Sequence, residues 1–170
     1  MKTAVFGGSF DPLHISHEKI INHLIDNFDL VYIVPVQNYM KKDFLIPIKD
    51  RIKIIKKIYK NNSKVKILDN ILYDKNFTYT YKVIRYIKKE FLADKLYFVL
   101  GSDYKNIKSW KNYNEILNSC QIYKISRDGL DGININTNSI SSSQIKENIE
   151  LHKNYINKTF LNYLKTNQYF

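Results

Sequence analysis

The sequence predicts an α/β fold in which a mainly parallel β-sheet is covered by helices on both faces. Short apolar runs typical of buried strands alternate with longer segments whose apolar residues recur at helical spacing, and this alternation continues through the 170 residues. Consecutive parallel strands need a crossover connection, which a helix supplies. The length fits one domain, 1–170, and no linker or internal repeat divides it.

Six segments are predicted to be strands, because each is a short apolar run bounded by polar, glycine or proline residues. The clearest is 96–100, which contains only apolar and aromatic residues and ends at Gly101. Segment 30–34 has the same character and ends at Pro35. The predicted strands are 4–6, 30–34, 65–68, 96–100, 121–125 and 133–135.

Helices are predicted where apolar residues recur every three or four positions, as Ile52, Ile55 and Ile58 do. Right-handed crossovers between such elements give a Rossmann-like arrangement, in which ligands bind beyond the carboxyl ends of the strands. We therefore expect 7–8 and 101–103, which follow the first and fourth strands, to face the same crevice. The first helix begins near residue 14, and the others are 48–59, 79–91, 113–117, 142–149 and 157–166.

Charge and cysteine content narrow the possible function classes. The formal net charge is +11, but only three of the 27 basic residues are arginine, and the lysines are spread along the chain. We interpret most lysines as solvent-exposed, and a small phosphorylated substrate accounts for the charge without nucleic acid as a partner. The single Cys120 cannot form an internal disulfide, and no apolar run is long enough to span a bilayer. We expect a cytoplasmic protein without a membrane partner.

The strongest functional signal is the stretch GGSFDPLHISH at 7–17, between the first predicted strand and the first predicted helix. Gly7 and Gly8 allow the backbone to approach a ligand closely and to adopt dihedral angles closed to other residues. The N–H groups at a helix start attract phosphate. The stretch therefore predicts an anion site.

A histidine pair makes this site more specific. His14 and His17 are three residues apart, so in the first helical turn they lie on one face. Imidazoles there can donate to phosphate oxygens and offset charge in a phosphoryl-type transition state. The alternative is a surface helix with incidental histidines. A zinc site is disfavoured because H-E-x-x-H is absent and His23, His152 and Cys120 stand at unrelated positions.

A second anion site is predicted at ISSSQIK, 140–146. Ser141 and Gln144 have the spacing of a capping box, so a helix should begin here, with Ser142 and Ser143 at its positive end. Lys146 adds a cation one turn later. The alternative is an ordinary capped surface helix.

Both stretches resemble signatures of the nucleotidyltransferase superfamily of adenylyl- and cytidylyltransferases. The first is similar to GGSFDPxHxGH, with Ser16 at the position of the usual glycine. The second is similar to ISSTxI(R/K), which in the superfamily holds the triphosphate of the nucleotide, and Lys146 stands where arginine is common. The resemblance implies that both stretches bind one nucleotide.

Shorter segments resemble the nicotinate/nicotinamide mononucleotide adenylyltransferases within that superfamily. Segment 34–42 is similar to their VPxxxPPHK motif, with Lys42 at the lysine that contacts substrate phosphate. The run Thr-Tyr-Thr that ends at Thr80 is similar to their SYT motif, whose threonine backbone helps to bind the pyridine carboxylate. The likeness spans nearly the whole chain.

Two further segments resemble the same family. The run FVLGSD contains Gly101 and Asp103, precedes Trp110, and is similar to FxxGxD…W, in which the tryptophan stacks on the pyridine ring. An aspartate after a strand also caps turns. The run SRDG, which contains Arg127, is similar to RPG.

Several of these residues have simpler interpretations. Trp110 could fill the core, as large aromatic residues often do. Lys41 and Lys42 could be a solvated pair in a loop. Arg51 and Arg127 could be surface ion-pair residues of little consequence.

The resemblance implies direct adenylyl transfer from ATP to nicotinate or nicotinamide mononucleotide, with release of pyrophosphate. The attacking phosphate is already ionised at neutral pH, since its second pKa is about 6, so catalysis needs positioning and charge neutralisation. The implied catalytic residues are His14, His17, Lys42 and Lys146, the nucleotide-binding residues are Gly7, Gly8, Ser9, Phe10, Gly101, Asp103, Ser142 and Ser143, and the substrate-binding residues are Thr80, Trp110 and Arg127.

The second phosphate site is assigned to the C-terminal helices, about 141–170, of the single nucleotidyltransferase domain. Mg²⁺ is expected to bind mainly through ATP, because no carboxylate cluster is visible, and Asp11 is expected to hold the turn. Two alternatives are open. One is a related nucleotidyltransferase with a phosphopantetheine or cytidylyl-type acceptor, and the other is a nucleotide- or RNA-binding module without turnover.

Overall fold

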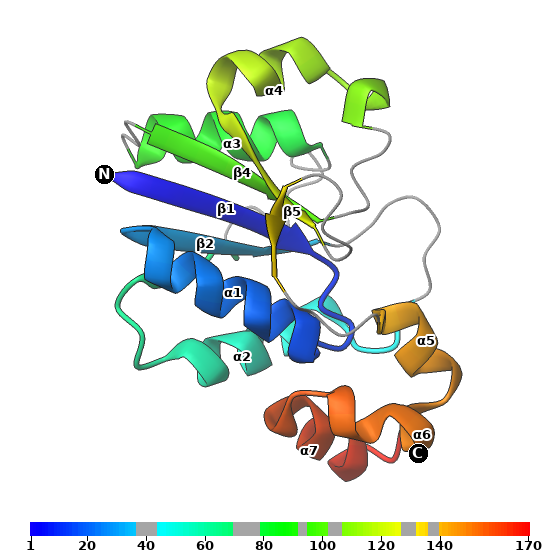
Figure 1. Cartoon of the computed structure of the whole chain (residues 1–170). Coiled ribbons are helices and arrows are strands. Elements are labelled where there is room, and N and C mark those ends of the chain that lie inside the picture. Colours follow the sequence, from blue (N-terminus) through cyan, green and yellow to red (C-terminus); the bar gives the residue numbers. More distant parts are fainter. Residues whose placement is uncertain (37–43, 70–78, 92–94, 102–106, 127–131, 136–139) are drawn as a thin grey trace.

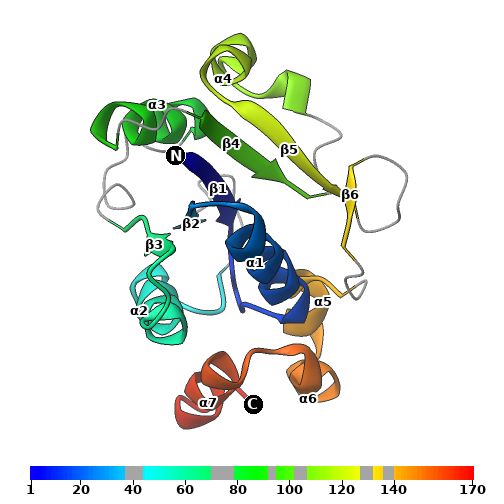
Figure 2. The same ribbon diagram turned by 60° about the vertical axis from the view of Figure 1, so that its left-hand side comes forward.

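The computed structural model describes residues 1–36, 44–69, 79–91, 95–101, 107–126, 132–135 and 140–170. Its centre is a β-sheet with the strand order β3-β2-β1-β4-β5-β6 (Figures 1 and 2). Each strand pairing that the described residues form is parallel, so the predicted sheet type is confirmed. The strands are β1 (Lys2–Gly8), β2 (Leu30–Pro35), β3 (Val65–Ile67), β4 (Lys95–Leu100), β5 (Gln121–Ser126) and β6 (Ile133–Asn134).

The helices lie close to their predicted positions, because apolar spacing is a strong signal in amphipathic segments. The predicted helix 48–59 coincides with α2 (Ile48–Tyr59). The others are α1 (Ile15–Asn27), α3 (Thr80–Glu90), α4 (Tyr113–Ser119), α5 (Ser142–Glu147), α6 (Ile149–His152), η3 (Lys153–Tyr155) and α7 (Lys158–Thr166).

The prediction of one helix over 142–149 is wrong, because the chain forms two short helices there. Asn148 stands between α5 and α6 with φ −152° and ψ 90°, outside helical geometry. Its side-chain oxygen accepts a hydrogen bond from the Leu151 N–H at 3.0 Å and so caps α6. Asparagine competes for backbone hydrogen bonds in this way and favours helix ends over interiors.

Helices cover both faces of the sheet, as predicted. Ala4 and Phe6 of β1 pack in one apolar cluster with α1 and the C-terminal helices, whereas Val5 packs in a second cluster with α3. Figures 1 and 2 show α3 and α4 on one side of the sheet and α1 on the other, with α5, α6 and α7 beyond α1. Both faces of β1 are therefore buried, which explains its unbroken apolar run.

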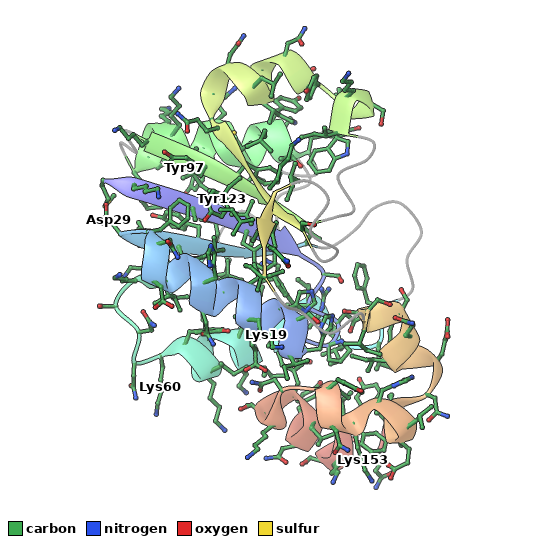
Figure 3. All side chains as sticks on the ribbon, viewed as in Figure 1. Lys19, Asp29, Lys60, Tyr97, Tyr123 and Lys153 are labelled. Atoms are coloured by element: carbon green, nitrogen blue, oxygen red, sulfur yellow. The ribbon has the colours of Figure 1, made fainter. Side chains whose placement is uncertain are left out.

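Side chains follow the same division between interior and surface. Figure 3 shows Tyr97 and Tyr123 over the sheet, where both rings contact Phe28, with ring centroids 5.3 and 5.0 Å away. Lys60, after α2, is exposed and points away from the body of the protein. None of the helices in the described part of the chain is long and apolar enough to cross a membrane.

The strand order places a crevice at the carboxyl ends of β1 and β4. The chain builds β1, β2 and β3 toward one edge and then crosses to β4 on the other side of β1. In open α/β sheets, ligands bind where the strand order reverses in this way. Phe6 pairs with Val99, so the segments that follow Gly8 and Leu100 leave the same edge of the sheet.

Candidate active site

The turn after β1 owes its shape to Phe10. Phe10 has φ 46°, in the left-handed region, and its ring is fully buried. A Cβ built on Gly8 would lie 2.9 Å from the Phe10 ring, so Gly8 must be glycine for the ring to lie there. A Cβ on Gly7 would meet its nearest atom, the Val34 carbonyl oxygen, at 3.9 Å.

The expectation that Gly7 and Gly8 adopt dihedral angles closed to other residues is therefore wrong. Both lie in the regular strand β1, and the residue in the left-handed region is Phe10. The glycines leave space for a ligand to approach the backbone, which is partly exposed at Gly7, Gly8 and the next residue, Ser9. The Phe10 ring lies in the core, so the donor that Phe10 can offer to an anion is its backbone N–H.

The two histidines meet at the start of α1. His14 is the N-cap with φ −133°, so it precedes the helix, whereas the sequence suggested a place in the first turn. His17 lies in that turn, and the ring centroids are 3.8 Å apart. The His14 backbone N–H donates to His17 Nδ1 at 3.4 Å. Because Nδ1 accepts, a neutral His17 carries its proton on Nε2, which can donate to a phosphate oxygen.

Burial distinguishes the residues of this helix start. The His14 side chain is 1% exposed, whereas His17 is partly exposed and more accessible to a ligand. Ser16, at the usual glycine position, is fully buried and fits without exposing its side chain.

Asp11 connects the turn to two other segments. Its carboxylate accepts hydrogen bonds from the backbone N–H groups of Leu45 and Ile46 at 2.8 and 2.9 Å. It also forms an ion pair with Lys146 of α5 at 3.5 Å. Asp11 is 1% exposed, so these contacts occupy a buried carboxylate. The expectation that Asp11 holds the turn is confirmed.

The second predicted helix start lies against the first. The capping box is present, with the Ser141 hydroxyl accepting from the Gln144 N–H at 3.3 Å and the Gln144 side chain accepting from the Ser141 N–H at 2.9 Å. The Ser142 hydroxyl donates to the Pro12 carbonyl at 3.2 Å, across 130 positions of sequence. With the ion pair from Lys146, this contact confirms that the two helix starts converge, as the position of α5 beside the start of α1 shows in Figure 1.

A third segment, around Ile156 and Asn157, supports the histidines, and no sequence motif pointed to it. Ile156 forms an antiparallel bridge with His14, and the Asn157 N–H donates to the Leu13 carbonyl at 3.1 Å. The Asn157 side chain also donates to Glu18 of α1 at 2.7 Å. The only hint in the sequence is that asparagine often caps helices, as Asn157 does for α7.

Residues predicted for the acceptor lie near the carboxyl end of β4. Trp110 packs edge-on against Phe98, with ring centroids 6.0 Å apart, and remains partly exposed. Thr80 is the first residue of α3. The Lys111 ammonium lies 4.5 Å from the centroid of the Tyr79 ring, so the start of α3 and the Trp110 segment are neighbours. Trp110 therefore does not serve only to fill the core.

Several predicted site residues cannot be placed. Lys41, Lys42, Asp103 and Arg127 lie outside the described residues. Gly101 is described, and a Cβ built on it would meet nothing within 4 Å, so the chain leaves open space beside it.

The interpretation of Arg51 as a surface ion-pair residue is wrong. Its side chain is fully buried in the first turn of α2. It donates to three backbone carbonyls: Ser9 in the turn after β1, Val36 after β2 and Ile46 before α2. Burial lowers the pKa of the Arg51 guanidinium, and the charge of Asp11 opposes that shift. An arginine remains protonated at neutral pH in such a site. Arginine is rarely buried, so sequence pattern alone did not suggest this position.

The described residues do not form a metal cage. No group of three histidine, cysteine, aspartate or glutamate side chains among them could hold an ion. The carboxylate of Asp11, in the turn after β1, is already engaged by two N–H groups and a lysine. The described residues at this crevice offer donors for anions. The side chains supply two imidazoles, hydroxyls and a lysine, and the two helix starts supply backbone N–H groups.

Residues 5–148 match the family model described as cytidylyltransferase-like. A Fusobacterium nucleatum protein named probable nicotinate-nucleotide adenylyltransferase is 35% identical over 162 residues, covering 92% of this chain and 82% of that protein. An Aliarcobacter butzleri protein with the same name is 31% identical over 133 residues, covering 76% of this chain and 73% of that protein. The fold is similar to that of a Plasmodium falciparum nicotinic acid mononucleotide adenylyltransferase complexed with NaAD, with a TM-score of 0.79, 24% identity and coverage of 98% and 96%. The chain belongs to the cytidylyltransferase-like family and, within it, to the nicotinate-nucleotide adenylyltransferases.

Proposed function

We propose that this nucleotidyltransferase moves the adenylyl group of ATP to nicotinate mononucleotide, forming a dinucleotide and pyrophosphate. One observation carries the proposal: two helix starts more than a hundred residues apart meet at the switch point of the sheet, with Ser142 on Pro12 and Lys146 on Asp11. Each helix start presents several free N–H groups to an anion, so two that meet can contact different phosphates of one triphosphate. The names of the relatives support the acceptor.

The reaction is an in-line displacement at the α-phosphorus of ATP. A phosphate oxygen of the mononucleotide forms the new bond, the bond to the β-phosphate oxygen breaks, and its electrons leave with pyrophosphate. The acceptor phosphate is ionised already, so no general base takes part. The chain contributes donors that hold the charge as it develops.

The donors divide between the two helix starts. We assign the backbone of Gly7, Gly8, Ser9 and Phe10, at and after the end of β1, to contacts with the phosphates. His14 and His17, whose ring centroids lie 3.8 Å apart, are assigned to the α- and β-phosphate region. Ser142, Ser143 and Lys146 hold the leaving pyrophosphate, which gains negative charge in the transition state. Mg²⁺ would be held mainly through the phosphate oxygens of ATP and would supply positive charge to them.

The acceptor binds at the β4 side of the crevice. The partly exposed Trp110 ring is available to stack on the pyridine. By family resemblance, the backbone of Thr80, the first residue of α3, is assigned to the pyridine carboxylate. By family resemblance, Gly101 and Asp103 contact the nucleotide, and Lys42 and Arg127 contact the substrate.

A pyrophosphate-release assay tests the proposal. Purified protein is incubated with ATP or CTP, each combined with nicotinate mononucleotide, nicotinamide mononucleotide or phosphopantetheine. We expect turnover with ATP and nicotinate mononucleotide above all other pairs. Turnover only with phosphopantetheine would show that the proposed acceptor is wrong. Turnover only with CTP would show that the proposed nucleotide is wrong. Salt-sensitive polynucleotide binding with no pyrophosphate from any pair would overturn the enzymatic proposal.

A further inference from the structure

A buried guanidinium lies directly behind the phosphate-binding turn. Arg51 Nε donates to the Ile46 carbonyl at 2.9 Å, and Nη1 donates to the Val36 carbonyl at 3.1 Å and to the Ser9 carbonyl. The guanidinium carbon also lies 4.3 Å from the centroid of the Phe44 ring. One side chain thus joins the turn after β1, the end of β2 and the residues that precede α2.

The contact with the Ser9 carbonyl bears on the conformation of the next residue. Phe10 is in the left-handed region, φ 46°, which is unfavourable for a residue with a Cβ and persists only where the surroundings impose it. The Ser9 carbonyl belongs to the same peptide plane as the Phe10 N–H. By accepting from Arg51, this carbonyl fixes the direction in which the Phe10 N–H points.

The ring of Phe10 then transmits this position to the histidine. Its centroid lies 5.0 Å from the His17 ring in an edge-to-face arrangement and 5.6 Å from Phe6 of β1. The ring also occupies the space that a Cβ on Gly8 would need. A change in the Ser9–Phe10 peptide therefore displaces the ring against which His17 packs.

Asp11 and Arg51 bind the two backbone groups of the same residue, Ile46. Arg51 binds the carbonyl of Ile46, while the Asp11 carboxylate binds the N–H of Ile46 at 2.9 Å. Both side chains are buried, with Asp11 1% exposed and Arg51 0% exposed. A planar fork with several fixed donors can reach three carbonyls together, which a lysine ammonium on a flexible stem cannot do with the same geometry.

We propose that Arg51 is a positioning residue for adenylyl transfer: it holds the Ser9–Phe10 peptide in its left-handed turn and thereby places the His17 ring before ATP binds. It acts through the turn and does not touch substrate. The expected effect of Arg51 on turnover rests on the proposed function. Its expected effect on the position of the His17 ring rests on the contacts alone. Positioning of this kind affects turnover strongly, because small displacements of donors weaken transition-state stabilisation.

Two variants of Arg51 and two controls separate positioning from stability. Arg51→Met keeps the length and removes every donor, and Arg51→Lys keeps the charge with a different geometry. Arg85→Met makes the same chemical change on α3, where the side chain is 65% exposed and ion-paired with Glu115. Ile87→Ala lowers stability from a fully buried position in the cluster on the other face of the sheet.

Two measurements are made on each variant below its melting temperature. We expect Arg51→Met to lower kcat about 100-fold at matched folded fraction, with the KM for the mononucleotide unchanged. Arg51→Lys should recover part of kcat, and Arg85→Met and Ile87→Ala should match wild type. The second measurement is the ¹⁵N imidazole spectrum of His17, identified by its loss in His17→Ala. Its signals should shift in Arg51→Met and not in the controls.

The outcomes distinguish the two proposals. A folded Arg51→Met with wild-type kcat and unshifted His17 signals would overturn the positioning role, and so would a loss equal to that of Ile87→Ala. An inactive wild type whose His17 signals still respond to Arg51 would overturn the proposed function and keep the structural coupling. If Arg51→Met does not fold, Arg51→Lys and Phe10→Leu carry the same test, since Phe10→Leu removes the ring between the turn and His17.

Discussion

At the residue scale, His14 and His17 share one sequence motif but occupy different environments. The His14 side chain is 1% exposed and its backbone bridges to Ile156, so it is built into the framework. His17 is partly exposed, and its Nδ1 accepts from the His14 N–H, which leaves the proton of the neutral ring on Nε2. His17 is therefore the better placed of the two to donate to a phosphate oxygen.

Replacing His17 by alanine should lower kcat about 10²- to 10³-fold, because it removes a donor at the phosphate that gains charge in the transition state. The melting temperature should remain close to that of wild type, since His17 is partly exposed. Steady-state pyrophosphate release and a thermal melt measure the two effects.

His23→Ala is the matched control for this prediction. It removes an imidazole from the same helix, where His23 Nε2 lies 2.8 Å from the Tyr123 hydroxyl, away from the turn. We expect wild-type turnover in His23→Ala. Full activity in His17→Ala would remove the histidine from the mechanism.

At the element scale, α5 is a short helix whose position depends on its caps and contacts. It contains six residues, and isolated helices of this length are not stable in water. Ile145 is fully buried and anchors it in the core, while the capping box at Ser141 begins it. The donors proposed for the leaving group therefore depend on a helix start that the rest of the fold holds in place.

Replacing Ser141 by alanine should raise the KM for ATP and lower the melting temperature by about 2–4 °C, because a lost cap costs about 1 kcal/mol. The KM for the mononucleotide should not change, since we propose that this substrate binds at the β4 side. Asn148→Ala removes the cap of the next helix, α6, and serves as the control. A KM for ATP that rises equally in Asn148→Ala would assign the effect to stability alone.

At the scale of the whole molecule, the C-terminal helices are joined to the sheet and its covering helices by buried and half-buried contacts. The Tyr163 hydroxyl of α7 donates to Asp50 of α2 at 3.0 Å, and Asn157 donates to Glu18 of α1. Phe160 and Leu164 are fully buried in the cluster that also contains Ala4 and Phe6. These contacts place the helix that carries Ser142 and Lys146 within the same packing unit as the glycine turn.

The stability of the whole molecule should fall at high pH through Cys120, which is buried in the cluster on the α3 side of the sheet. Burial raises the pKa of the Cys120 thiol from 9.0 to about 11, so the unfolded chain loses this proton first as the pH rises. The native state then binds more protons than the unfolded state, and the free energy of unfolding decreases with pH. The loss should begin near pH 9 and continue to about pH 11.

Urea unfolding of wild type and Cys120→Ala measures this effect. Tyr32 also has a raised pKa, about 12, so the prediction concerns the difference between the two chains and not the absolute slope. The free energy of Cys120→Ala should fall less between pH 9 and pH 11. Parallel pH profiles would show that the thiol does not contribute.

Local pattern was sufficient for most of the fold. The apolar spacing of α2 predicted its limits at Ile48 and Tyr59, and the strands were predicted to within two residues of their observed ends. A helix buried along one stripe has apolar residues at helical spacing, and a strand buried on both faces has a continuous apolar run. It was not sufficient at Asn148, where a side chain competes with the helix backbone. That competition depends on neighbours in space as well as on residue type.

The sequence by itself determined the parallel α/β architecture, the two helix starts with their capping signals and the histidine pair, because these depend on contacts between residues close in the chain. Only the tertiary structure decided that Ser142 lies on Pro12, that Asp11 and Arg51 hold Ile46 from two sides, and that Phe10 takes the left-handed turn. These features depend on hydrogen bonds between distant segments. Their donors and acceptors are mostly backbone groups, which every residue carries, so residue identity does not reveal the pairing.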